Sequence, residues 1–102
     1  MEPAPHVHWK TLDDLEASLR DCQRIYEEDP ARHRQLREAV IQAKDRARYA
    51  SRNPRISAEK RAAKEEMVRW MLVWLDDPSL FADWVTLRRG QIGGAQTGSG
   101  GA

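Results

Sequence analysis

The chain has 102 residues, of which 32% are charged, and its 17 Lys and Arg nearly balance its 16 Asp and Glu, for a formal net charge of +1. A chain of this length usually builds one hydrophobic core, so we expect a single domain and no second catalytic domain. The small net charge excludes a chain that is basic or acidic as a whole, so charge has to be examined segment by segment.

The N-terminal stretch and the cysteine content point to the compartment. The first residues, MEPAPHVHWK, lack the positive start and the apolar run that a signal peptide needs. No window holds the roughly 18 consecutive apolar residues of a membrane span. The single cysteine, Cys22, cannot form an internal disulfide or a zinc site built on several thiolates, which points to a reducing compartment. We therefore expect a soluble cytoplasmic protein that does not bind membranes.

Apolar residues recur at helical spacing along most of the chain, and no segment shows the clean apolar alternation of a half-buried strand. We expect an all-α fold, a small bundle of about four helices. Residues 1–10 contain two prolines and are expected to form an irregular arm. A single helical domain should follow over 11–89, and a flexible Gly-rich tail over 90–102.

Two amphipathic helices are expected first. Thr11 and Asp14 have the spacing of a capping box and predict that the first helix begins there. Asp29 can cap the second helix, with Pro30 in its first turn. Large residues on one seam and small residues on the other would let the two helices approach closely as an antiparallel αα-hairpin. The seams are Leu12, Leu15, Leu19, Cys22 and Tyr26, and then Leu36, Val40, Ala43, Ala47 and Ala50.

The third helix is predicted over 58–76. Pro54 excludes the preceding residue from the helical region and so predicts a turn, and Ser57 can cap the helix that follows.

The fourth helix is predicted from 78 to about 89. Asp77 and Pro78 repeat the pattern of an acidic cap followed by proline, and Gly90 is expected to end the helix. The tail after it has five glycines and no charge, so it is most simply a flexible end or an appended remnant. One face of this helix would carry Leu80, Phe81, Trp84 and Val85.

Residues 67–75, MVRWMLVWL, are apolar except for Arg69 and cover roughly 260° of a helix circumference. One neighbouring helix cannot cover that arc, so this helix must pack on at least two sides. It is either the central helix of the bundle or partly exposed and buried against a second copy or another protein. The apolar interaction surface of the second interpretation comprises Met67, Trp70, Met71, Trp74 and Trp84.

Charge is separated along the chain. Residues 11–30 carry a local balance of −5 and residues 44–64 a balance of +6. Arginine matches phosphate with a planar fork, and Tyr49 lies among these bases as a stacking surface. The simpler interpretation is a solvated face that pairs with the acidic first helix, within the chain or between copies. The basic, phosphate-binding surface of the other interpretation comprises Arg48, Arg52, Arg55, Arg61 and Lys64.

No constellation of residues predicts catalysis, a cofactor or a metal centre. His6 and His8 supply two ligands, which are not a site, and His33 has no partner at helical spacing. Cys22 falls on the apolar seam of the first helix, where a thiol is buried and poorly ionised. We expect a non-enzymatic protein that binds itself, as a homodimer, or another protein. The alternative is a nucleic-acid or phosphate-binding accessory protein that uses the basic surface of residues 44–64.

Overall fold

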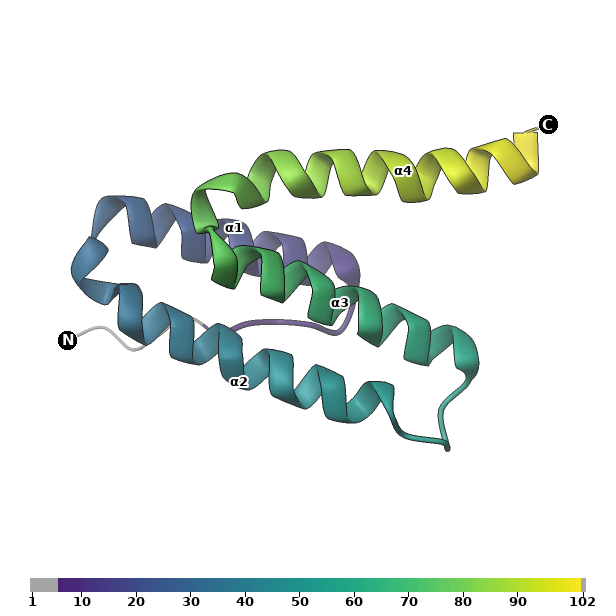
Figure 1. The fold of residues 1–102 in the computed structure, drawn as a ribbon, viewed down its shortest axis with the longest axis horizontal. Coiled ribbons are helices and arrows are strands. Elements are labelled where there is room, and N and C mark those ends of the chain that lie inside the picture. The colour runs from purple at the N-terminus through teal and green to yellow at the C-terminus, as the bar shows by residue number, and fades with distance from the viewer. Residues whose placement is uncertain (1–5, 102) are drawn as a thin grey trace.

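The computed structural model describes residues 6–101, with side chains described as far as residue 92. Four α-helices joined in part by two 3₁₀ turns make up this part of the chain, which contains no strand, so the expected all-α bundle is confirmed (Figure 1). No helix among the described residues is long and apolar enough to cross a membrane. The elements are α1 (Leu12–Glu28), η1 (Pro30–Arg32), α2 (His33–Ser51), α3 (Ala58–Asp76), η2 (Pro78–Leu80) and α4 (Phe81–Gly101).

Side-chain caps fix the starts of α1 and α3 where the sequence predicts them. A third cap begins η2 at Pro78, where the sequence predicts the fourth helix, and α4 itself begins at Phe81. The Thr11 hydroxyl accepts a hydrogen bond from the Asp14 backbone N–H at 3.1 Å, and Ser57 does the same for Lys60 at 3.1 Å. Asp77 accepts from the Ser79 backbone N–H at 3.0 Å and so begins η2. Such caps supply acceptors for N–H groups that have no partner within the helix.

The boundary between α1 and α2 differs from the prediction. Asp29 makes no side-chain cap bond to the element that follows. Its backbone N–H instead donates to the Ile25 carbonyl at 2.8 Å and closes α1. Pro30 then opens the single turn η1, and α2 begins at His33.

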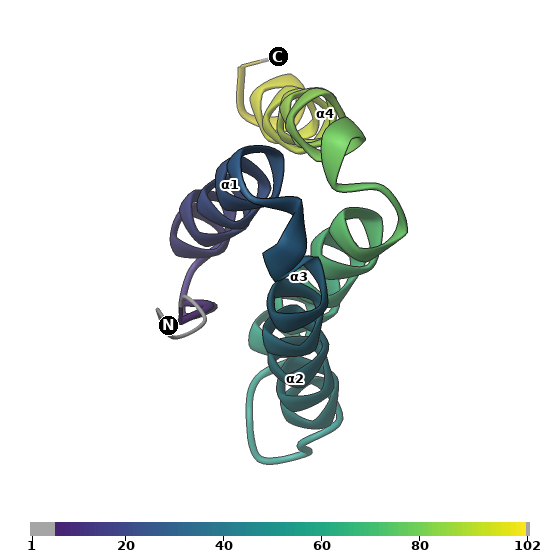
Figure 2. The same cartoon turned by 90° about the vertical axis from the view of Figure 1, so that its left-hand side faces the viewer.

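The third helix is the centre of the bundle, as the breadth of its apolar arc requires. Trp70 and Trp74 are fully buried, together with Phe81 of α4. Figure 2 shows α3 with α2 on one side and with α1 and α4 on the other. The rest of the core comes from all four helices and from the N-terminal segment: Val7, Leu15, Leu19, Cys22, Leu36, Val40, Ala43, Ala47, Met67, Val68, Met71 and Val85.

The closest backbone pairing joins α2 and α3, whereas the sequence predicts it between the first two helices. α1 and α2 do run in opposite directions, but they diverge from η1 and make few contacts (Figures 1 and 2). Helices approach closely where the side chains between them are small, and α2 buries Ala43 and Ala47. The small-residue seam of α2 therefore brings the backbone of α3 close, and α1 packs on the remaining side of the core.

The N-terminal segment before α1 packs on the bundle. Val7 is buried, and the His8 backbone N–H donates to the Ser18 hydroxyl of α1 at 2.9 Å. Trp9 is partly buried against the core. Residues 6–11 are non-helical, and the first five residues of the expected arm lie outside the described part of the chain.

Helix α4 continues through Gly90 to Gly101, whereas the sequence predicts that Gly90 ends it. A glycine ends a helix by adopting positive φ, and no described glycine does so. Gly90 is therefore an ordinary helical residue. A Cβ built on it would meet nothing within 4 Å. The flexibility predicted for the tail stays a prediction.

Replacement of Gly90 tests whether the helix passes through this position. Gly90→Ala should raise the free energy of unfolding by about 0.5–1 kcal/mol, because alanine has the higher helix propensity and space is free for its methyl group. Chemical denaturation followed by circular dichroism measures the change. Destabilisation would mean that Gly90 adopts positive φ and ends the helix.

Candidate interaction surfaces

Four of the five residues of the predicted apolar interaction surface lie in the core. Met67, Trp70, Met71 and Trp74 are all buried within this single chain, which leaves only Trp84 partly exposed. The reason is that α1, α2 and α4 surround α3, so the wide apolar arc of α3 finds its partners inside the monomer. The core interpretation of MVRWMLVWL therefore holds for these four residues.

A different apolar surface remains outside the core, where the end of α3 meets the start of α4. We define the α3–α4 apolar surface as Leu72, Val73, Leu80, Trp84 and Leu87. The exposed fractions of its three leucines are 43% for Leu72, 57% for Leu80 and 69% for Leu87. All but Leu87 line a shallow hollow of about 420 Å³, and Leu87 extends the same stripe of α4 by one turn.

The face predicted for the fourth helix includes both Leu80 and Phe81, but of these two only Phe81 is buried. Adjacent helical residues point about 100° apart, so the residues 80, 81, 84 and 85 form two neighbouring stripes. Phe81 and Val85 enter the core, while Leu80 and Trp84 line the hollow. Spacing alone could have separated the two stripes.

Trp84 connects the hollow with the core. Its ring meets Trp70 edge to face, with centroids 6.4 Å apart and an interplanar angle of 84°. That geometry is favourable for aromatic pairs. Charged groups of both signs, Arg69, Asp76 and Asp77, surround the apolar residues of the hollow.

The predicted basic residues gather at the turn that joins α2 and α3, at the lower right of Figure 1, with one exception. Lys64 lies farther along α3, where its ammonium group stands 4.8 Å from the centroid of the Trp9 ring. We define the basic tip as Arg48, Arg52, Arg55, Lys60 and Arg61, with Tyr49 among them.

The basic tip does not pair with the acidic first helix. Within residues 6–92, no ion pair joins the tip to any acid, and its five bases make no ion pair at all. The acids of α1 pair instead with Arg20 and Arg24 of the same helix and with Arg89 of α4. The simpler interpretation expected these bases to pair with the acidic first helix. Within residues 6–92 of one chain, no such ion pair is present.

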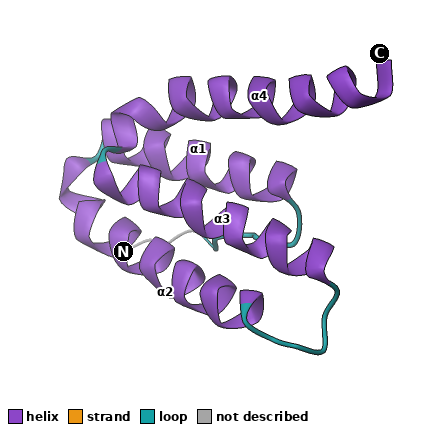
Figure 3. Ribbon diagram, turned by 45° about the vertical axis from the view of Figure 1, so that its right-hand side comes forward, coloured by secondary structure: helices purple, strands orange, loops and turns teal. Residues whose placement is uncertain are grey.

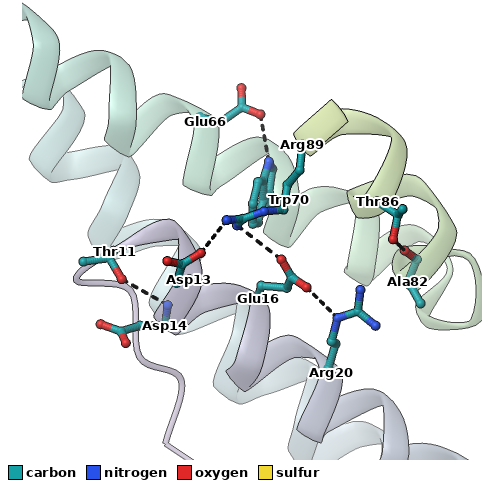
Figure 4. A network of polar contacts seen from close by, with 10 residues as sticks. All are labelled: Thr11, Asp13, Asp14, Glu16, Arg20, Glu66, Trp70, Ala82, Thr86 and Arg89. Atoms are coloured by element: carbon teal, nitrogen blue, oxygen red, sulfur yellow. Dashed lines mark hydrogen bonds and ion pairs between the residues drawn. The ribbon is translucent and has the colours of Figure 1, made fainter. Parts of the chain in front are cut away.

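Two adjacent arginines tie α4 to the rest of the bundle in different directions. Arg89 reaches Asp13 and Glu16 of α1, and its guanidinium lies over the Trp70 ring at 5.8 Å (Figure 4). Arg88 reaches α3, where both of its hydrogen bonds end on Glu66 at 2.7 Å. No role was assigned to Arg88 or Arg89 from the sequence alone. Their position beside the buried stripe of α4 could have indicated ion pairs with neighbouring helices.

Glu66 joins three side chains in one network of four hydrogen bonds. Its carboxylate accepts two bonds from Arg88, one from Arg69 at 2.7 Å and one from the indole N–H of Trp70 at 2.7 Å. The hydrogen bonds from Arg88 hold the pKa of Glu66 below its usual value; burial opposes that shift, and the bond from Trp70 adds to it. The Trp74 indole N–H, in contrast, has no acceptor among the described residues. The network therefore orients Trp70 and fixes α4 on α3.

Cys22 and the three histidines make separate contacts in the described part of the chain. Cys22 is buried, and this burial raises the pKa of its thiol to about 11. The rings of His6 and His8 meet edge to face with their centroids 4.6 Å apart. The centroids of the His33 and Tyr26 rings are 4.8 Å apart. Among the described residues, no group of three or more His, Cys, Asp or Glu is placed to hold a metal ion.

Comparison of the chain with known protein families, with curated proteins and with solved structures found no match. A function therefore has to be inferred from the geometry of the α3–α4 apolar surface and the basic tip.

Loss of the Glu66 carboxylate should destabilise the fold. Glu66→Ala leaves the buried Trp70 N–H without an acceptor and should lower the free energy of unfolding by about 1–3 kcal/mol. Glu66→Gln keeps an oxygen for that indole and should cost less. Glu65→Gln, at the exposed neighbouring position, is the matched control and should unfold like the parent chain in urea.

The same network predicts a dependence of stability on pH. The pKa of Glu66 is lower in the folded chain than in the unfolded chain. The contribution of its carboxylate to the free energy of unfolding is therefore present in full above the unfolded pKa of about 4.3, and it is lost as the pH falls through the folded pKa. Thermal unfolding is measured from pH 7 down to the acid range. The melting temperature should fall less with pH in Glu66→Gln than in the parent chain. Parallel curves for the two proteins would contradict this assignment.

Cys22 should react slowly while the protein is folded. With a pKa of about 11, only about one thiol in a thousand is ionised at pH 8, and its sulfur is enclosed. A chromogenic disulfide reagent should therefore label Cys22 at a rate limited by opening of the structure, and rapidly in denaturant. Immediate labelling of the native protein would show that the α1 seam is open.

Proposed function

We propose that this protein is a non-enzymatic binding module that self-associates through the α3–α4 apolar surface. The observation that carries the proposal is that Leu72, Leu80 and part of Trp84 stay exposed around one hollow after the core is complete, with Leu87 exposed on the next turn of α4. Contiguous apolar surface of this kind marks interaction sites more often than scattered single residues do. The absence of catalysis and a cytoplasmic location stay predictions from the sequence.

The charges around the hollow favour a second copy as the occupant. A two-fold dimer brings the same patch of both subunits together, so a self-complementary patch needs groups of both signs. Arg69 and the acids Asp76 and Asp77 border the same hollow, and the Arg69 side chain is 54% exposed. A two-fold arrangement lets the arginine of one copy face the acids of the other while the leucines meet at the centre.

The rigidity of the surface supports the same proposal. Trp84 is held by its contact with Trp70, and α4 is fixed on α3 through Arg88 and Glu66. A surface that is already ordered loses little conformational entropy when it binds. More of the free energy gained by burying apolar surface then remains as binding affinity.

The decisive measurement is the absolute mass in solution, by light scattering behind a sizing column, at low and at high salt. A dimer that persists or strengthens at high salt supports apolar association, because salt screens charges and does not weaken apolar burial. A dimer that falls apart at high salt would instead show pairing between the acidic and basic segments of two copies. A monomer at every concentration contradicts the proposal.

Single substitutions should locate the interface. Leu80→Lys and Leu87→Lys should each weaken dimerisation by about 1.5–3 kcal/mol, the value of burying one leucine, with unchanged helical content. Thr86→Lys is the matched control, because Thr86 is exposed on the same helix and outside the apolar stripe. Equal loss of dimer in the control would show a general effect of added charge on α4. A dimer unaffected by both leucine variants would place the interface elsewhere.

A further inference from the structure

The basic tip concentrates positive charge that the rest of the fold leaves unpaired. Residues 46–64 hold seven bases and only one acid, Glu59. The five bases of the tip make no ion pair within residues 6–92, and Arg52, Arg55 and Lys60 are exposed. Because the chain as a whole carries +1, this positive field is local to one end of the molecule.

An exposed aromatic ring lies among these bases. Tyr49, in the last turn of α2, is 82% exposed, the largest value among the exposed large hydrophobic residues. An open hollow of about 530 Å³ beside it is lined by Tyr49, Arg52, Asn53, Pro54 and Arg55. A solvent-exposed tyrosine beside arginines offers a flat face for stacking and cations within the same small area.

The turn that presents these groups is internally hydrogen-bonded. The Asn53 side chain accepts from the Arg55 backbone N–H at 2.9 Å, and the Asn53 backbone N–H donates to the Ala50 carbonyl at 3.1 Å. The Ser51 hydroxyl donates to the Arg48 carbonyl at 2.6 Å. The backbone under the arginines is therefore held in place before any ligand arrives, which lowers the entropic cost of binding.

We propose that the basic tip binds single-stranded nucleic acid, with Arg52 and Arg55 on backbone phosphates and Tyr49 stacked on a base. Arginine forks match phosphate oxygens, and an aromatic side chain stacks on a base only where that base is unpaired. The acids of α1 lie on another part of the bundle and repel a polyanion, which confines the strand to the tip. This site is separate from the α3–α4 apolar surface, so either proposal can fail without the other.

The first experiment titrates the full chain into a fluorescent oligothymidylate of about 12 nucleotides, a length within the site sizes of single-strand binders. Affinity should fall linearly with the logarithm of salt concentration, with a slope of about −0.7 for each phosphate contacted. Arg52→Glu with Arg55→Glu should abolish binding. The matched control is Arg24→Glu with Arg34→Glu, which changes the net charge equally at exposed positions away from the tip and should bind nearly as the parent chain does.

The second experiment separates stacking from charge. Tyr49→Ala should weaken oligothymidylate binding about 5- to 150-fold with an unchanged salt slope, whereas Tyr49→Phe should retain most of the affinity. An unchanged affinity in Tyr49→Ala would overturn the proposed stacking. Equal loss of binding in the Arg24 and Arg34 control would overturn the site at the tip.

Competitors test the kind of partner. Inorganic phosphate and vesicles of anionic phospholipid supply phosphate without bases, so both should compete weakly with the single strand. A duplex of the same length should also compete weakly, because its bases are already stacked. Vesicles or duplex that displace the oligothymidylate at matched phosphate concentration would overturn the proposal in favour of a general polyanion surface.

Discussion

The arrangement of the bundle depends on the breadth of the apolar arc of α3. A helix that carries apolar side chains around most of its circumference has to be covered from several directions, and no single neighbour can do this. The small residues of α2 bring that helix close along one side, while α1 and α4 cover the rest. With this cover in place Trp70 and Trp74 are enclosed, and most of the apolar residues of MVRWMLVWL lie in the core.

A polar network completes what apolar packing begins. Figure 3 shows that α4 lies at the outer edge of the bundle, and its contacts are with α1, α3 and η2. Arg88 and Glu66 fix α4 to α3, and Arg89 connects it to the acids of α1. Ion pairs at exposed positions contribute little each, so Glu66, the most enclosed of these groups and also the partner of Trp70, is the important member. Within residues 6–92, the basic tip makes no ion pair with these acids.

Both proposed surfaces follow from this way of covering α3. The hollow forms where α3 ends and α4 begins, because Phe81 and Val85 turn inward and leave Leu80 and Trp84 on the adjoining stripe. The basic tip forms at the opposite end of α3, where the tight pairing of α2 with α3 brings the last turn of one and the first turns of the other together. One surface is apolar and the other is cationic. High salt should therefore preserve or strengthen association through the apolar surface and weaken binding at the basic tip.

The sequence by itself determined the helical class, the caps at Thr11, Ser57 and Asp77 and the limits of α3, because these depend on periodicity and on bonds within a few residues. It also placed four of the five residues of the predicted basic surface near one turn. Only the tertiary structure decided that α2 pairs with α3, that five residues of MVRWMLVWL are core and that Leu80 is exposed. It also decided that α1 pairs with Arg89. Helical spacing defines which residues share a face, but which neighbour covers that face is decided by the packing of all four helices at once.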